Sequence, residues 1–583
     1  MNENTLGDET KPSIWKWSWL LPIIVIFVLA EVIVYRFGVH QPFSDEFSTP
    51  GRILYELSQG RFSWKDLWAW HNEAHMVFPK ILWIIEALAV GWHVKTWMYF
   101  GVILTALEVV LLCLLLEVRA FSEKTRWLLG LAFALILLHP CNAPGTFLRG
   151  SQYIAIVPGF LLVLGSFINI KASRLGTLFA SYCALSTIGT LTFPNGMALW
   201  VLLYPYFPVF KMWGSGDRDL RKKIIGYSLA SFAFGLALIG CYFIGYSEVR
   251  QDAGLKLPHP DYVGYFFKWM GAPLALHFKK EYSAAFGYGV TALSLILPAF
   301  LFLTALVRRM LGRIEVAWPW LMLIAYGLLS ATASSLGRAS IPQDQSVAGR
   351  YFLISLQLVA GILGLWLVLA AYEASGAVRR RKVFSQSLIF ATLGLVLVFE
   401  LGTWNLGYSQ SAKHLFSRSK EQLALNLWDE APLITPIPFF IPTPPSVRPK
   451  YLTLIETGFL KNQGDGIWLS EALKVAADKK PIGEVRVNGQ GENLRVSSHL
   501  SKVFAKCPNP ALLTTLRLPD GTLAPVAVDL MSPQVTKKGL PGLQIYTKPF
   551  RNNVTHCQNA NDLVFFALDP MRKKAYLLKS VIK

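Results

Sequence analysis

Long apolar segments alternate with short polar intervals over the first 404 positions of the chain. A helix that crosses a bilayer needs about 20 apolar residues, because the hydrocarbon core is about 30 Å thick. Segment 81–94 is too short to cross and carries Glu86 and Gly91, so it is predicted to lie on or dip into the outer membrane face. The pattern predicts about eleven spanning helices, at 15–37, 97–116, 127–138, 153–170, 175–191, 197–210, 224–246, 288–307, 317–333, 351–372 and 384–404.

The pattern changes near position 405. A proline-rich stretch at 435–450 is followed by short alternating apolar and polar patches, separated by turn pairs such as Asn488-Gly489 and Asp520-Gly521. Alternation with a period of two, punctuated by such pairs, is typical of strands and hairpins. We therefore expect two domains: a helical membrane domain at 1–404, with a first outer loop at 38–94, and a soluble, mostly β domain at 405–583 with one helix near 468–477.

Composition and charge agree with a multi-pass membrane protein. Hydrophobic residues make up 53% of the chain, charged residues only 16%, and the mean hydropathy is +0.40. The net charge of +20 could indicate nucleic-acid binding, but the Lys and Arg residues gather in short intervals between alternate apolar segments. That distribution is the positive-inside pattern. It predicts a cytoplasmic N-terminus, an outward-facing first loop and an outward-facing C-terminal domain; the first span is too long for a signal peptide.

The six cysteines fit this topology. Cys507 and Cys557 are the only two in the C-terminal domain, and outside the cytosol they are expected to form a disulfide; the alternative is two small buried apolar residues. The other four lie in or at the end of apolar segments: Cys113, Cys141, Cys183 and Cys241.

The first polar interval, 41–80, holds more chemistry than a connecting loop needs. It contains the acidic pair Asp45-Glu46, the cluster His71-Asn72-Glu73-Ala74-His75, and a Pro-Lys exit at Lys80. Its position between two apolar segments suggests the floor of an active site at a membrane surface.

The order of features resembles the GT-C glycosyltransferase superfamily, whose members span the membrane many times and use lipid-phosphate-linked sugars. An acidic pair follows the first helix closely, an amphipathic stretch at 53–57 comes next, and Gly60-Arg61-Phe62 closes it. The sequence HMVFPKILW at 75–83 looks like the stretch that enters the second interfacial helix of lipid A aminoarabinose transferases and protein mannosyltransferases. The resemblance covers positions 1–120 and the overall topology. The MIR domain and the WWDYG motif of other members are absent.

The resemblance implies a polytopic, GT-C-like fold and an inverting-type glycosyltransferase in a bacterial inner membrane. It would move a sugar from a polyprenyl-phosphate carrier to a cell-envelope glycan, lipid or protein on the outer face. The first-loop acid Asp45 would act on the acceptor, and Glu46 would be the alternate or a metal ligand, since some members use a divalent ion such as Mg²⁺ or Mn²⁺. The chemistry agrees, because glycosyl transfer needs a carboxylate at the acceptor. The plainer alternative for Asp45 is a helix N-cap near Thr49.

The second cluster is expected to bind substrate. The residues His71, Asn72, Glu73 and His75 suit hydrogen bonds to sugar hydroxyls or to a phosphate. The His-x-x-x-His spacing could also bring two imidazoles together on a metal, and a solvated turn before a helix is the plainer alternative.

A departing phosphate needs cations. Arg350 is the first choice, because it begins a span next to Tyr351, where a guanidinium would sit at the depth of lipid phosphates. Arg338 and Lys80 are also predicted on the outer face. The alternative for each is snorkelling to lipid headgroups.

Other functions remain open. The acids Glu31, Glu108 and Glu400 lie in apolar segments and could mark the proton path of a transporter or flippase for a lipid-linked sugar. An O-antigen polymerase or ligase would place its key Arg and His in a later loop, and the interval 247–286 contains such residues.

Overall fold

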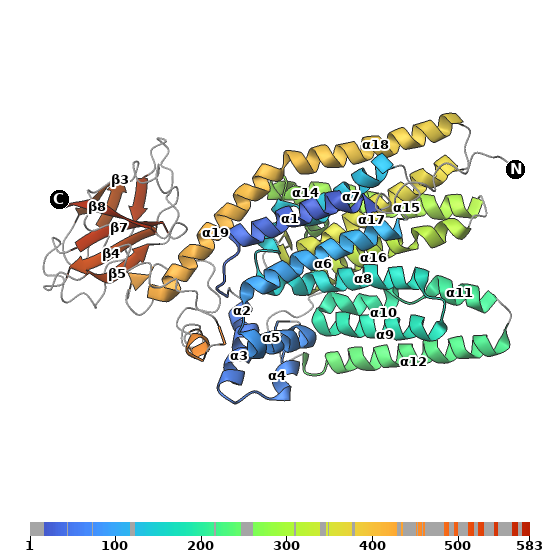
Figure 1. The fold of residues 1–583 in the computed structure, drawn as a ribbon, viewed down its shortest axis with the longest axis horizontal. Coiled ribbons are helices and arrows are strands. Elements are labelled where there is room, and N and C mark those ends of the chain that lie inside the picture. Colours follow the sequence, from blue (N-terminus) through green and yellow to red (C-terminus); the bar gives the residue numbers. More distant parts are fainter. Residues whose placement is uncertain are drawn as a thin grey trace. The chain divides into compact units, whose positions relative to one another are not determined.

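The computed structural model is dominated by long helices (Figure 1). It describes residues 17–42, 45–72, 74–116, 123–214, 217–246, 261–307, 311–338, 346–347, 349–375, 379–427, 433–434, 451, 453–457, 459–460, 483–488, 495–499, 511–517, 523–529, 542–545, 563–569 and 574–582. The chain divides into two compact units. The first comprises Met1–Gly38, Arg61–Glu86 and His93–Ser411, and the second comprises Val39–Gly60, Ala87–Trp92 and Ala412–Lys583.

Within the described residues, ten helical segments are long and apolar enough to cross a membrane. The chain is therefore a multi-pass membrane protein. The helices that supply these segments are α1 (Leu20–Phe37), α6 (Val94–Leu115), α7 (Glu123–Leu138), α8 (Tyr153–Lys171), α9 (Leu175–Thr192), α12 (Arg218–Tyr242), α15 (Ser283–Val307), α16 (Leu311–Arg338), α17 (Gly349–Ser375), α18 (Arg379–Gly402) and α19 (Trp404–Leu427). The pair α18 and α19 together forms one of the ten.

The predicted continuous span at 197–210 is wrong. The chain there forms three short pieces: η5 (Pro194–Ala198), α10 (Leu199–Leu202) and α11 (Tyr206–Gly214). Pro205 interrupts the helix because proline has no backbone N–H and clashes with the preceding turn. The apolar residues on both sides of Pro205 and Pro208 give this segment the composition of a span, although the prolines break its helix.

The broken segment still runs back along the bundle. Helices α9 and α12 are parallel, since Phe179 stacks on Tyr227 with ring centroids 5.5 Å apart and Cys183 Sγ lies 3.2 Å from Ser231 Oγ. The chain between two parallel neighbours must return to the end where the first one began. Consistent with this, Lys211 in α11 pairs at 2.5 Å with Glu315, near the start of α16. The predicted reversal of direction between 175–191 and 224–246 is therefore kept, although a broken segment and not a continuous helix makes the return.

Close contacts between small residues hold other helices together. Helix α14 (Asp261–Ala275), in the predicted outer interval, packs along α15. A Cβ on Gly271 would collide with the backbone at Ser283 and Gly287, and a Cβ on Gly287 would collide with the Phe267 carbonyl. Such glycines let helix backbones approach closely, as is common in membrane bundles. The aromatic ring of Trp269 in α14 is fully buried.

Several short helices follow α1: α2 (Asp45–Ser48), α3 (Pro50–Ser58), α4 (Trp64–Trp68) and α5 (Val77–Val90). The fourteen residues of α5 are too few to cross about 30 Å of hydrocarbon. This agrees with the prediction that segment 81–94 does not span the membrane.

Among its described residues, the second unit contains an eight-stranded mixed sheet with the order β1-β5-β4-β7-β8-β2-β3-β6, drawn as arrows in Figure 1. The pairs β1–β5 and β2–β8 are parallel, and the other five are antiparallel. The strands are β1 (Leu433–Ile434), β2 (Gly483–Asn488), β3 (Arg495–His499), β4 (Ala511–Arg517), β5 (Leu523–Asp529), β6 (Gly542–Ile545), β7 (Leu563–Asp569) and β8 (Lys574–Ile582).

These strands fall inside the segment predicted to be mostly β, whereas α19 continues across the predicted boundary at 405. The predicted helix near 468–477 lies outside the described residues, as do Cys507 and Cys557. The placement of this segment outside the cytoplasm stays a prediction.

Candidate functional site

A cavity of about 560 Å³ lies in the first unit, where several helix ends converge. Its walls come from the end of α12, the last turns of α16, the start of α17, the turn at η5 and the η4–α8 junction, where η4 is Gly150–Gln152. The first polar interval adds His71, Asn72, Ala74 and Met76. Every one of these segments was predicted on the outer face. The structure shows that they also meet around a single cavity.

The opposite ends of two of these helices, α12 and α8, carry positive charge. Helix α12 begins with Arg218, Arg221, Lys222 and Lys223, and Lys171 ends α8. The separation of a basic end from a cavity end fits the positive-inside pattern. The orientation in a membrane stays a prediction.

The cavity walls are mainly apolar and aromatic, with a few amide and hydroxyl groups. Tyr242, Phe243 and Tyr246 supply rings from the end of α12. Two amide atoms on the walls, Gln152 Oε1 and Asn195 Nδ2, are buried and have no hydrogen-bond partner among the residues that the structure describes. Unpaired buried polar atoms cost free energy, so a polar group of a ligand would relieve both.

The first-loop wall has an unusual backbone. Asn72 and Met76 have φ angles of 52° and 53°, in the left-handed region. Asparagine tolerates this conformation, but methionine rarely adopts it. Both residues line the cavity, and strained backbone of this kind concentrates at functional sites.

His75 holds this wall in place. Its side chain is fully buried; Nε2 lies 2.9 Å from the Tyr242 carbonyl, and Nδ1 contacts the Trp68 carbonyl. The ring also lies against Trp70, with centroids 3.8 Å apart. Burial lowers the pKa of His75, partly opposed by the two carbonyl contacts. The observed contacts give His75 a positioning role, fastening the first loop to α12, and do not support the predicted contact with substrate.

Lys80 is also used structurally. It is 2% exposed, and its ammonium donates to the carbonyls of Asp66, Leu67 and Ala69 at 3.1, 3.0 and 2.6 Å. These carbonyls belong to the C-terminal end of α4, where a cation is favoured by the helix dipole. The predicted contact between Lys80 and a donor phosphate finds no support in this geometry, because three carbonyls already engage the ammonium.

Replacing Lys80 with methionine should destabilise the protein by about 2–4 kcal/mol, since the buried carbonyls would lose a charged donor. Thermal unfolding of the purified protein in detergent measures this. Lys65→Met is the matched control, because Lys65 is exposed on α4, the helix whose end Lys80 caps. If the two variants were equally stable, the structural role of Lys80 would be refuted.

The acidic pair belongs to the second unit. Asp45 opens α2 and is half-buried, and Glu46 is 2% exposed. Thr49, rather than Asp45, occupies the N-cap position of α3, so the helix-cap alternative for Asp45 does not apply to that helix. Next to this region, Arg418 donates to the Gln41 carbonyl at 2.8 Å. The catalytic role of Asp45 and Glu46 stays a prediction.

The remaining predicted residues are only partly described. Arg338 ends α16, and Arg350 is the second residue of α17; their side chains lie outside the described part of the chain, as does Glu73. Tyr351 lines the cavity and is 4% exposed. Both arginines therefore belong to helices whose adjoining ends form the cavity wall.

Glu86 is a titratable group to which no functional role was assigned from the sequence; it served only as a sign that segment 81–94 does not cross the membrane. Its Oε2 accepts a hydrogen bond from Trp97 Nε1, and Trp97 stacks on Tyr153 with centroids 4.8 Å apart. Burial raises the pKa of Glu86 to about 7, although the hydrogen bond from Trp97 opposes the shift. This carboxyl therefore titrates near neutrality.

Glu86→Gln should flatten the pH dependence of stability. The folded pKa of about 7 exceeds the ordinary value of 4.5, so the folded chain holds the proton more tightly and wild-type stability falls as pH rises between these values. Above pH 7 the variant should be more stable by about 1–2 kcal/mol, a figure reduced to allow for partial solvent exposure. Unfolding measured across this range tests the expectation, with exposed Glu281→Gln as the control. A wild-type slope in the Glu86 variant would contradict it.

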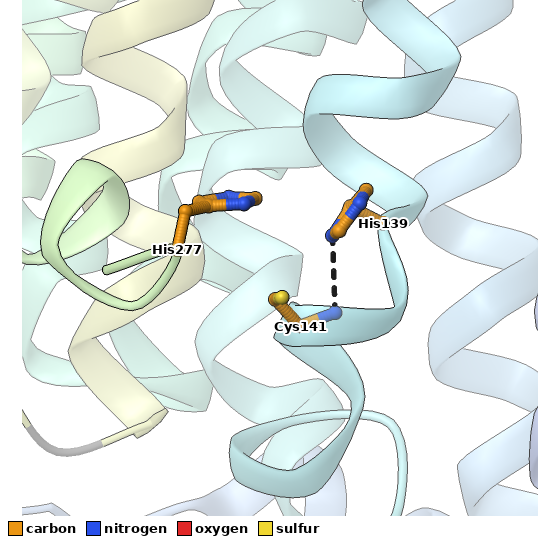
Figure 2. Close-up of side chains that lie close together, drawn as sticks. All are labelled: His139, Cys141 and His277. Atoms are coloured by element: carbon orange, nitrogen blue, oxygen red, sulfur yellow. Dashed lines mark hydrogen bonds between the residues drawn. The ribbon is translucent and has the colours of Figure 1, made fainter. Parts of the chain in front are cut away.

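A second cluster of buried side chains was not predicted from the sequence. His139, Cys141 and His277 offer ligand atoms that all lie within 4.8 Å of one another, and all three side chains are buried (Figure 2). This group could hold a metal ion. Burial, with the neighbouring His139, lowers the pKa of His277 to about 3, so His277 is the neutral imidazole that metals bind. The His139-Pro140-Cys141 spacing was the available signal, but His277 comes from a distant interval that nothing in the sequence linked to it.

Comparisons of the chain with protein-family models, with curated proteins and with solved structures find no match.

Proposed function

We propose that the protein is a membrane glycosyltransferase that moves a sugar from a polyprenyl-phosphate carrier to a cell-envelope glycan, lipid or protein. The observation that carries this proposal is the cavity of about 560 Å³ at the converging helix ends. Its volume is in the usual range for small-molecule sites, about 300–1,000 Å³. A donor with a lipid tail also requires a site on a protein that lies in the bilayer, and the ten apolar helices meet that requirement.

The cavity lining suits a sugar attached to a lipid. The rings of Tyr242, Phe243 and Tyr246 offer flat apolar surfaces for the sugar face or the lipid tail. The unpartnered amide atoms of Gln152 and Asn195 would hydrogen bond to sugar hydroxyls. The strained first-loop backbone at Asn72 and Met76 fixes one wall.

The reaction also needs an acid–base group and a phosphate-binding cation. In this proposal Asp45 is the acceptor-side carboxylate, and Glu46 is its alternate. Arg350, next to the cavity residue Tyr351, binds the donor phosphate, with Arg338 as the second choice. These roles come from the sequence, and a variant below tests the role of Asp45.

Two other functions share the lipid-linked substrate. A transporter or flippase would move it across the membrane without forming a new glycosidic bond. A polymerase or ligase of the O-antigen type would make the bond with residues from the interval 247–286, of which positions 247–260 lie outside the described chain. Product analysis separates transport from transfer, and variants in the first loop separate the two enzyme classes.

Filling the cavity should block donor binding. Ala333 lines the cavity on α16, so Ala333→Phe is expected to lower both co-purified polyprenyl-phosphate lipid and sugar transfer at least about tenfold, through steric exclusion worth roughly 1.4 kcal/mol or more. Mass spectrometry of the purified protein measures the lipid, and incorporation of labelled sugar measures transfer. Thr332→Phe is the matched control, because Thr332 is exposed on the same helix and does not line the cavity. Equal loss in both variants would argue against a substrate cavity.

Asp45→Asn should abolish transfer while donor lipid still co-purifies, because the amide keeps the shape of the side chain but cannot accept a proton. The expected fall in rate is about 10²–10⁴-fold, typical of a lost general base. The readouts are labelled-sugar transfer and the elution profile of the purified protein. Normal transfer of labelled sugar by this variant would refute the assignment of Asp45. Transport of the lipid-linked sugar without any transfer product would favour the flippase.

A further inference from the structure

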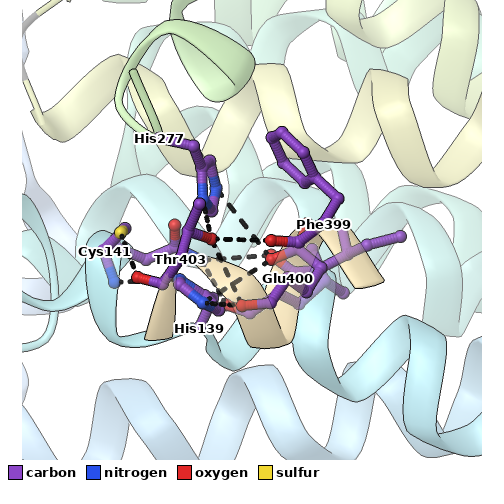
Figure 3. Close-up of polar contacts among 9 residues, drawn as sticks. His139, Cys141, His277, Phe399, Glu400 and Thr403 are labelled. Carbon is purple, nitrogen blue, oxygen red and sulfur yellow. Dashed lines mark hydrogen bonds and ion pairs between the residues drawn. The ribbon is translucent and has the colours of Figure 1, made fainter. Parts of the chain in front are cut away.

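We propose that His139, Cys141, His277 and Glu400 form a binding site for a structural divalent metal ion of the zinc class. The four side chains come from three separate segments: the end of α7 with η3 (Pro140–Gly145), the turn after α14, and the last turn of α18. Figure 3 shows the three labelled metal-ligand candidates of Figure 2 gathered around Glu400 and Thr403. This site is distinct from the cavity, because none of the four residues lines it.

His277 is oriented for coordination. Its Nδ1 lies 2.7 Å from Thr403 Oγ1, and that hydroxyl donates to the carbonyls of Phe399 and Glu400 at 3.0 and 3.2 Å. Since the hydroxyl proton is already used, Thr403 Oγ1 must accept from the Nδ1–H of His277. Nε2 of His277 then carries a free lone pair. Fixing the ring through its other nitrogen is how proteins usually prepare a metal-binding histidine.

The carboxylate of Glu400 is the fourth ligand of the proposed site. Its Oε2 lies 3.9 Å from Nε2 of His277 and 3.9 Å from Nε2 of His139. These distances are too long for hydrogen bonds, and Oε2 is buried with no hydrogen-bond partner in the described part of the chain. In a tetrahedral zinc site, neighbouring ligand atoms are ~3.3–3.8 Å apart, because Zn–N and Zn–S bonds are about 2.0 and 2.3 Å long. The two separations from Glu400 therefore need only a small contraction, whereas the ligand atoms of the other three residues, within 4.8 Å of one another, must move together by up to ~1–1.5 Å.

Cys141 and His139 are the other two ligands. Cys141 Sγ is buried, and its contact with the Thr403 carbonyl is weak at 3.8 Å. His139 accepts from the Cys141 backbone N–H at 3.1 Å and donates from Nε2 to the Glu400 carbonyl at 2.7 Å. To coordinate, the His139 ring must exchange one of these hydrogen bonds for the metal. It is therefore the least prepared ligand of the four.

Charge and ligand type point to the same class of ion. Cys141 and Glu400 bind as anions, so any proton on either group is released as the ion enters. Two neutral imidazoles, one thiolate and one carboxylate around a divalent ion give a site with no net charge, which is the form that burial favours. Mixed nitrogen and sulfur ligands select zinc-like ions over Mg²⁺ or Mn²⁺. Four protein ligands leave no open position for substrate, so the ion would be structural.

The first test is metal binding by the purified full-length chain in detergent. After chelator treatment, Co²⁺ should bind with roughly one ion per chain, as expected for one closed tetrahedral site, and should show a tetrahedral visible spectrum with a sulfur-to-cobalt charge-transfer band. Zn²⁺ should displace the Co²⁺. Cys141→Ala should remove the charge-transfer band, and His277→Gln should weaken binding more than His139→Gln does.

Two further variants sharpen the test. Thr403→Val removes only the group that orients His277, so affinity should fall by about 10–100-fold while the charge-transfer band persists at saturation. Cys113→Ala is the matched control, because Cys113 is a fully buried free cysteine on α6 outside the group. It should leave both affinity and spectrum unchanged. Zn²⁺ should also raise the unfolding temperature of the wild-type protein more than that of His277→Gln.

Three results would overturn the proposal. Wild-type protein with no saturable Co²⁺ binding refutes it, and this measurement does not depend on any variant folding. A wild-type spectrum without sulfur ligation refutes it as well. Binding that survives unchanged in Cys141→Ala and His277→Gln would place the ion elsewhere in the chain. None of these results bears on the proposed glycosyl transfer, which the cavity and Asp45 variants test separately.

Discussion

Buried backbone carbonyls at helix ends are the constraint on which much of this structure depends. Inside a bilayer or a packed bundle no water pairs with the last carbonyls of a helix, so side chains must supply the donors. Lys80 does so for the end of α4, and His75 contacts the carbonyls of Trp68 and Tyr242. Asn142 donates to Ile136 and Leu137 at the end of α7. The polar residues of the helix ends are largely used to satisfy the backbone.

This requirement separates positioning residues from residues free to meet a ligand. His75 and Lys80 look like site residues in the sequence, because polar side chains in an apolar setting suggest chemistry. In the structure their polar atoms face carbonyls, and the cavity wall they support presents Asn72, Gln152 and Asn195 instead. The cavity and the metal group share this logic: each contains a buried polar atom that the backbone does not use, Gln152 Oε1 in one and Glu400 Oε2 in the other.

Features that depend on residues close together in the sequence were predictable, whereas contacts between residues far apart in the sequence were not. The apolar segments were predictable because crossing a bilayer requires a long run of apolar residues. Helix α5 was recognisably too short to cross. The break at Pro205 was also local and readable, but apolar residues on both sides hid it. The grouping of His139 with His277 was not predictable, because it depends on how the turn after α14 meets the end of α7. The surroundings of Lys80 likewise depend on how the chain turns between α4 and α5.

The parallel pairing of α9 and α12 imposes an order on assembly. Two consecutive antiparallel helices can enter a membrane together as a hairpin, but parallel neighbours cannot. The contacts of Phe179 with Tyr227 and of Cys183 with Ser231 can form only after the intervening broken segment has crossed back. That segment has short helices and three prolines, Pro194, Pro205 and Pro208, none of which can donate a backbone hydrogen bond. The contacts that join α9 to α12 therefore depend on this segment having already crossed back.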